Sequence, residues 1–256
     1  MKRTLYQKFF GALAKCFFPK AETVYHGEDT DEPAVYLCNH SAAIGPALMT
    51  LYFEKPHRTW MIGYVFDKKK NANYFAHDGF FLRARKCKWF WRVLSKITVT
   101  LLRPLLFAGN PILVHHDRRI IETLRESLDA LVNEKTSLVI FPESPKRFSP
   151  YVSTIYDGFA DIGRMYYNET GKCLKFFPVY AEKHNRVISV GDPIVYDPTL
   201  QAKEQRRIIA DYIRDNIDAL ARALPEHEPT PFLPDLWYEY YGEYETNVAE
   251  YWKLFE

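Results

Sequence analysis

The sequence predicts an α/β fold, a single domain in which a mixed, largely parallel sheet is covered by helices. Short apolar runs typical of buried strands alternate along the chain with longer segments whose apolar residues recur at helical spacing. No glycine/serine linker, low-complexity run or internal repeat divides the 256 residues. A chain of that length can bury a sizeable core as one domain. Because parallel strands need crossover connections, the alternation favours one sheet with helices on its faces.

The individual elements follow from these two patterns. Short apolar runs predict strands at residues 34–38, 59–65, 111–114, 137–141, 174–180 and 186–190. Helical spacing of apolar residues predicts helices at residues 4–18, 47–53, 89–106, 117–132, 156–167 and 202–222. Gly45-Pro46 starts the second of these helices, with proline in its first turn, and Gly171 marks the exit of the helix at 156–167.

Three parts of the chain differ in composition. Residues 1–20 are expected to form an amphipathic helix that contacts a membrane, because Leu5, Phe9 and Leu13 repeat at every fourth position among lysines. Residues 21–224 are expected to form the α/β domain. Residues 225–256 form an acidic, aromatic C-terminal extension.

Charge is distributed unevenly. Residues 1–120 carry 19 Lys and Arg against 9 Asp and Glu, whereas the remainder carries 15 against 23. A basic, aromatic-rich first half suits an anionic surface or ligand. The most apolar segment, at 89–106, contains Arg92, Lys96 and Arg103, so it does not predict a membrane span. Its basic and aromatic residues fit either an interfacial helix or packing on the domain itself.

Metal and disulfide chemistry are not expected. The four cysteines are scattered and form no C-x-x-C pair, which indicates reduced packing residues in a cytosolic compartment. His115, His116 and Asp117 are adjacent, and three adjacent residues cannot all turn toward one ion. The sequence therefore predicts no metal site.

Four short segments join a predicted strand end to a polar residue: Asn39-His40, His116-Asp117-Arg118, Phe141-Pro142-Glu143-Ser144 and Phe177-Pro178-Val179. Ligands in such sheets bind beyond the carboxyl ends of the strands, so the first three segments could converge. In their order and separations, the four segments resemble the sequence blocks of the phospholipid/glycerol acyltransferase family. The resemblance covers about residues 34–222.

This resemblance implies a glycerolipid acyltransferase-like fold and a reaction. A fatty acyl group would move from acyl-CoA or acyl carrier protein to a lysophospholipid or glycerol-phosphate-type hydroxyl, with no cofactor. His40 would be the base, since an imidazole pKa of ~6.5 lies near working pH. Arg118 would clamp a phosphate, as a guanidinium can do with two hydrogen bonds. The substrate-binding residues around the acceptor would be Glu143, Ser144, Lys146 and Arg147.

The chain departs from the family at one catalytic position. The first block of the family reads N-H-x-x-x-x-D, and Gly45 stands at the position of its Asp. By analogy with Ser-His-Asp proteases, losing that carboxylate can cost ~10⁴ in rate. Another carboxylate such as Asp78 or Glu143 could orient His40 instead, as could Ser41 or a backbone carbonyl. Alternatively, the site no longer catalyses.

The expected partners are an anionic membrane surface, a lysophospholipid-like acceptor, and acyl-CoA or acyl carrier protein. We expect the protein in the cytoplasm, peripheral on the inner face of the membrane. A catalytically inactive lipid-binding or scaffold protein on the same fold is the main alternative. Nucleic acid is not an expected partner, because no recognised binding motif accompanies the basic clusters at 68–70 and 83–86.

Overall fold

The structure of the protein is a computed structural model. The structure describes residues 18–42, 44–63, 109–115, 119–230 and 232, together with Lys15, Trp89, Phe90, Val93, Leu94, Lys96, Ile97 and Thr100. The expected amphipathic helix at 4–18, most of the expected helix at 89–106, residues 233–256 of the C-terminal extension and Arg118 lie outside these residues.

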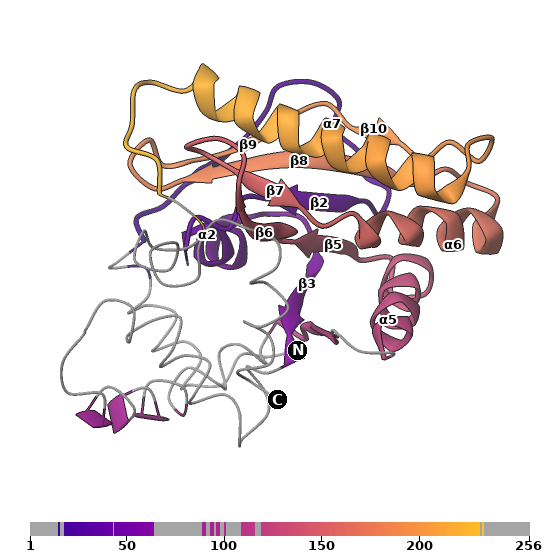
Figure 1. Ribbon diagram of the computed structural model, residues 1–256, viewed down its shortest axis with the longest axis horizontal. Helices are drawn as coiled ribbons and strands as arrows, with labels where there is room; N and C mark the ends of the chain where they lie inside the picture. The colour runs from indigo at the N-terminus through magenta and orange to yellow at the C-terminus, as the bar shows by residue number, and fades with distance from the viewer. Residues whose placement is uncertain are drawn as a thin grey trace.

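The described residues form a single α/β domain around a mixed, mostly parallel sheet (Figure 1). Its strands are β1 (Glu22–Tyr25), β2 (Val35–Cys38), β3 (His57–Ile62), β4 (Ile112–Val114), β5 (Ser137–Ile140), β8 (Lys175–Glu182), β9 (Val187–Val190) and β10 (Ile194–Val195). They are arranged in the order β1-β9-β8-β2-β5-β3-β4, with β10 paired antiparallel to β8. The strands β8, β2, β5, β3 and β4 run parallel, so their carboxyl ends lie at one edge of the sheet.

Helices cover both faces of this sheet. The helices are α2 (Ile44–Tyr52), α5 (Ile120–Val132), α6 (Asp161–Thr170) and α7 (Ala202–Ala223), with a 3₁₀ turn η3 at Gly158–Ala160 before α6. Val35 and Leu37 of β2 pack with α5, α6 and α7, while Tyr36 and Cys38 pack with α2 on the other face. This alternation follows from the two-residue period of a strand. Because both faces are covered, β2, β5 and β9 are buried along their whole length.

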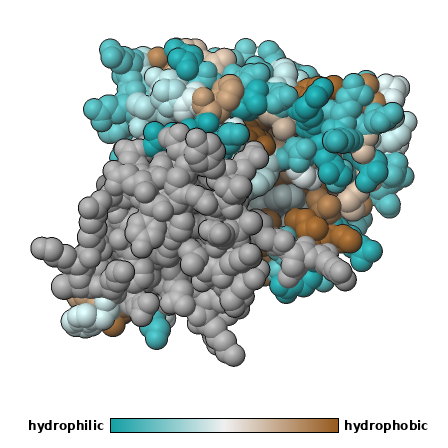
Figure 2. All heavy atoms as spheres, viewed as in Figure 1, coloured by the Kyte–Doolittle hydropathy of each residue, from teal (hydrophilic) through white to brown (hydrophobic). Residues whose placement is uncertain are grey.

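The outer side of the α7 layer is mostly hydrophilic, whereas a hydrophobic patch lies over α5 (Figure 2). Ile120 and Ile121 of α5 are among the exposed apolar residues. An ion pair joins this helix to the sheet: Arg58 of β3, nearly buried, donates to Glu126 and, at 3.0 Å, to Glu134. None of the described helices is long and apolar enough to cross a bilayer.

A second, two-stranded sheet lies after β5. Its strands are β6 (Glu143–Arg147) and β7 (Ser153–Ile155), which pair antiparallel and pack against α7. The sequence did not predict this hairpin, nor β1 or β10. It predicted a helix at 156–167, but Tyr156 donates its amide to the Pro142 carbonyl at 2.9 Å, so the helix begins only at Asp161. The predicted helix end at Gly171 is confirmed by its left-handed φ of 70°.

Candidate active site

His40 lies directly beyond β2, the central strand of the sheet, in a tight turn that leads into α2. Ser41 and Ala42 both adopt the left-handed region, with φ of 42° and 53°. Non-glycine residues rarely adopt it, and such conformations are concentrated at functional sites. The amide of Ile44 then donates to the Ser41 carbonyl at 3.0 Å, and that of Gly45 to the His40 carbonyl at 3.2 Å. The turn therefore reverses the chain within a few residues and brings the Ala42 carbonyl back to the imidazole.

That carbonyl fixes the tautomer of His40. Nδ1 of the ring lies in hydrogen-bond contact with the Ala42 oxygen. Since a carbonyl can only accept, Nδ1 carries the proton and Nε2 keeps its lone pair. A backbone carbonyl thus takes the orienting role that a carboxylate has in a His-Asp pair. A backbone carbonyl was one of the orienting groups considered from the sequence, and it is the group that contacts the imidazole.

Two phenylalanine rings flank the imidazole. The ring of Phe141, which follows β5, lies edge-on at 5.6 Å between centroids, and the ring of Phe232 lies at 4.9 Å and a tilt of 59°. Burial lowers the pKa of His40 to about 4, and the Ala42 hydrogen bond acts in the opposite direction. The ring is therefore neutral at physiological pH, and His40 remains partly exposed.

Glu143 holds the backbone of this turn. The side chain is buried, and its Oε1 accepts the His40 amide at 2.5 Å while Oε2 accepts the Ser153 amide at 2.7 Å. Burial raises its pKa, and the backbone hydrogen bonds act against that rise. Because β2 and β5 are parallel neighbours, the residues that follow them meet at one edge of the sheet. Glu143 joins the His40 turn to the β6–β7 hairpin through backbone amides and does not contact the imidazole nitrogens.

Asn39 fastens the same turn to β8. Its Oδ1 accepts the Ala181 amide at 2.7 Å, and its Nδ2 donates to the Ala181 carbonyl at 3.2 Å and to Ser41 Oγ at 2.6 Å. The side-chain amide thus continues the strand pairing where β2 ends. Asn39 was part of a sequence motif, but its role depends on a residue far along the chain and could not be read from the motif.

Gly45 is required by the backbone around it. A Cβ atom at position 45 would stand 2.0 Å from the Asn39 carbonyl oxygen and 3.2 Å from that of His40. Cβ atoms do not approach oxygen that closely, so no other residue fits without moving the turn. The absent carboxylate and the tight turn are therefore one structural feature.

The remaining predicted site residues lie on the hairpin or outside the described residues. Ser144 is buried and its hydroxyl contacts that of Thr154. Lys146 and Arg147 are exposed at the end of β6. Arg118 lies beyond β4, in a stretch that the structure does not describe. Among the described residues, no three His, Cys, Asp or Glu side chains gather into a metal-binding group.

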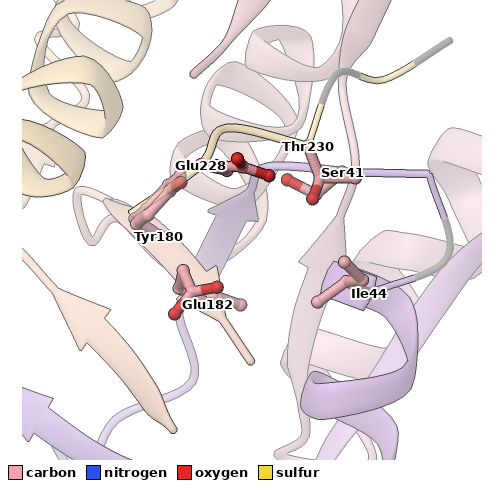
Figure 3. Close-up of a pocket in the computed structure, with 7 residues that line it drawn as sticks. Ser41, Ile44, Tyr180, Glu182, Glu228 and Thr230 are labelled. Atoms are coloured by element: carbon pink, nitrogen blue, oxygen red, sulfur yellow. The ribbon is translucent and has the colours of Figure 1, made fainter. Parts of the chain in front are cut away.

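No pattern in the sequence indicated the last part of the site. Residues 225–230 and Phe232, which we call the C-terminal strap, follow α7 and return to the His40 turn. Glu228 and Thr230 of the strap face Ser41 and Ile44 across a small recess beside Tyr180 (Figure 3). Phe232 closes onto the imidazole. The strap belongs to the expected C-terminal extension, whose composition did not indicate where it packs.

Comparison with known proteins shows similarity at the level of structure. No protein-family model matches the chain, and no curated protein sequence matches it. Among solved structures, the chain is similar to the crystal structure of the 1-acyl-sn-glycerophosphate (LPA) acyltransferase PlsC from Thermotoga maritima. The TM-score is 0.49 and the identity 13%, over 86% of this chain and 80% of that chain.

Proposed function

We propose that this protein is an acyltransferase that acts at a membrane surface. It would move a fatty acyl group from acyl-CoA or acyl carrier protein to a lysophospholipid or glycerol-phosphate-type hydroxyl, without a cofactor. The observation that carries the proposal is the His40 tautomer. With Nδ1–H held by the Ala42 carbonyl, Nε2 is left as a proton acceptor at the carboxyl edge of a parallel sheet.

The proposed reaction uses this nitrogen twice. Nε2 takes the proton of the acceptor hydroxyl as its oxygen attacks the thioester carbonyl. The C–S bond then breaks, and the imidazolium returns the proton to the departing thiolate. In Ser-His-Asp enzymes the rate falls by ~10⁴ when the wrong tautomer is held. Here the Ala42 carbonyl supports the required tautomer, so the site lacks the charge of the carboxylate but keeps the orientation it provides.

An anionic acceptor would complement this site electrostatically. A His40 pKa of about 4 makes the ring a weak base in the free protein. A phosphate bound nearby would stabilise the imidazolium and raise that pKa. We assign the phosphate to Arg118 on sequence grounds. Lys146 and Arg147, exposed on β6, are proposed to bind the rest of the acceptor head together with Ser144.

Glu143 contributes to the acceptor site by holding the backbone of the His40 turn next to the β6–β7 hairpin. Both carboxylate oxygens accept backbone amides, one from His40 and one from Ser153 of β7. The residue therefore sets the distance between the proposed base and the hairpin that carries Lys146 and Arg147.

Contact with an anionic membrane would deliver the lipid substrate, with the protein on the inner face. The basic and aromatic residues of 1–20 and 83–106 support this. Trp89, Val93 and Ile97 are 71%, 48% and 52% exposed, and they are spaced four residues apart. Such a row suits an interfacial helix flanked by lysine and arginine.

The test is transfer of a labelled acyl chain from acyl-CoA and from acyl carrier protein to a panel of lysolipids and glycerol phosphate. We expect transfer by the wild type, loss of at least about a hundredfold in His40→Ala, in line with removal of a general base, and no change in Phe148→Ala, an exposed control. Full activity of His40→Ala would exclude His40 as the base. No transfer to any acceptor from either donor would exclude the reaction.

A catalytically inactive lipid-binding or scaffold protein is the second candidate. The observation that favours it is the apolar cover on the imidazole, together with the absence of any carboxylate from the ring among the described residues. This candidate predicts lipid binding that is unchanged in His40→Ala. The lysolipid panel separates the two candidates, because only the enzyme yields acylated product.

A further inference from the structure

The C-terminal strap is anchored at its root. The Tyr180 hydroxyl is hydrogen-bonded to His227 Nε2 at 2.9 Å, while His227 Nδ1 donates to the Pro225 carbonyl at the same distance. Nδ1 carries a proton, because a carbonyl oxygen can only accept. The Tyr151 ring lies 5.2 Å from that of His227 and completes an aromatic cluster with Tyr180. These contacts fix the direction in which the strap leaves α7.

From this anchor the strap crosses the end of β8 toward the His40 turn (Figure 3). Glu228 and Thr230 form one wall of the small recess whose other wall includes Ser41 and Ile44. At its tip, Phe232 meets the His40 ring at 4.9 Å. A segment distant in sequence from β2 thus supplies an aromatic ring to the proposed base.

We propose that Phe232 is a positioning residue of the His40 site, and that its ring holds the imidazole against Phe141 and excludes water from it. Ala42 constrains the ring only through Nδ1, and one hydrogen bond leaves the ring plane free to tilt. Contacts with two aromatic rings remove that freedom, because aromatic rings attract one another most strongly in edge-on or tilted arrangements such as these. Tyr180, through His227, is the tether that keeps the strap in place.

The effect of Phe232 on catalysis rests on the proposed acyl transfer, whereas the contact between Phe232 and the His40 ring does not. A dry, oriented, neutral imidazole can accept a proton as soon as the hydroxyl arrives. The carboxylate of Glu143 is bound to the His40 amide rather than to the imidazole. Two aromatic rings lie against the imidazole, and removing Phe232 leaves one of these contacts open to water.

The test compares Phe232→Ala with Phe232→Leu in the full chain, with Phe148→Ala as the matched control. Phe148 is 45% exposed, and its ring packs on Arg214. The first readout is the pKa of the His40 imidazole by NMR, with the resonance assigned by its loss in His40→Gln. The second is the rate of carbethoxylation of His40 at pH 7, followed by mass spectrometry. At that pH the wild-type ring is already neutral, so a faster rate reports access.

We expect Phe232→Ala to raise the His40 pKa from about 4 toward the ordinary value of ~6.5 and to speed carbethoxylation several-fold. Phe232→Leu keeps an apolar group of similar bulk and should retain most of the lowered pKa, and Phe148→Ala should match the wild type. Tyr180→Phe keeps its ring but loses the tether, so carbethoxylation should quicken.

Wild-type values for both readouts in Phe232→Ala would overturn the positioning role, as would an equal change in Phe148→Ala. A wild-type rate in Tyr180→Phe would overturn the tether. Because neither readout needs substrate, a chain that transfers no acyl group and still shows the pKa change would overturn the proposed function alone. Acyl transfer combined with an unmoved pKa in Phe232→Ala would overturn the positioning role alone.

Discussion

At position 45 the fold accepts no side chain larger than hydrogen, because a Cβ would lie 2.0 Å from the Asn39 carbonyl oxygen. We expect Gly45→Ala and Gly45→Asp to lower the free energy of unfolding by about 1–3 kcal/mol or more, the usual cost of an overpacked site. Gly45→Asp should restore no activity, since the turn must open to admit the carboxylate. Urea denaturation measures the change. Gly158→Ala, where an added Cβ meets nothing within 4 Å, is the matched control and should be nearly neutral.

A restored family Asp that raises both stability and acyl transfer would contradict this account of the turn. A special backbone angle is not the reason for glycine at this position. Gly45 lies in the first turn of α2 and is not among the residues with positive φ, and close approach of the backbone excludes the side chain.

His40 makes stability depend on pH. Burial lowers its pKa from 6.5 to about 4, so between these values the unfolded chain binds a proton that the folded protein does not. The free energy of unfolding should therefore fall as pH drops from 6.5 toward 4, by up to about 3 kcal/mol from this residue. Urea denaturation of the wild type and His40→Gln across this range measures it. Equal slopes in both proteins would show that the His40 pKa is close to its ordinary value.

Asn39 links two strands beyond the point where β2 ends. Replacing it by Ala leaves the Ala181 amide and carbonyl without their side-chain partners in a buried site. Each unsatisfied buried group costs about 1–3 kcal/mol, so we expect Asn39→Ala to lose about 2–4 kcal/mol and the Ala181 amide to exchange hydrogen faster. Asn133→Ala, which removes an exposed hydrogen bond to Asp129, serves as the control. An unchanged exchange rate of the Ala181 amide in Asn39→Ala would mean that the Asn39 side chain does not stabilise this end of the sheet.

The buried parallel strands could be predicted because their signal is local. Val35–Cys38 and Ser137–Ile140 are continuous short runs flanked by polar residues, and they match the predicted strands within one residue at each end. The β6–β7 hairpin could not be predicted, because its sequence is polar and rich in proline. The buried Glu143 carboxylate stabilises it by accepting the Ser153 amide. The strand β1 is half-exposed and only four residues long, and its partner β9, at Val187–Val190, lies far along the chain.

In the site, too, features with a local sequence signal could be predicted, and features that depend on tertiary contacts could not. The sequence indicates that the His40 and Glu143 segments meet, because each follows the end of a predicted strand and the strands are parallel. That the Ala42 carbonyl holds the imidazole depends on positive φ at two non-glycine residues, for which the sequence carries no signal. Phe232 reaches His40 only through the packing of the strap on β8.

For the whole molecule, the asymmetric charge and the exposed apolar row of Trp89, Val93 and Ile97 predict how it meets a membrane. We expect the double variant Trp89→Ser and Ile97→Ser to weaken binding to vesicles containing anionic lipid by about tenfold or more. Burial of one large apolar side chain contributes about 1.5–3 kcal/mol when complete, and less in an interface. Vesicle sedimentation measures the loss. Because both side chains are largely exposed, the melting temperature should not change.

The matched control is Phe148→Ser, which removes an exposed apolar side chain from the β6–β7 hairpin. It should bind vesicles as the wild type does. Higher salt should weaken wild-type binding, since each basic residue near an anionic surface contributes about 1 kcal/mol that ions screen. The salt effect should persist in the Trp89→Ser and Ile97→Ser variant, because its basic residues remain. Wild-type sedimentation of that variant would instead mean that the row is not the membrane-contacting surface and that the lipid substrate reaches His40 from another side of the molecule.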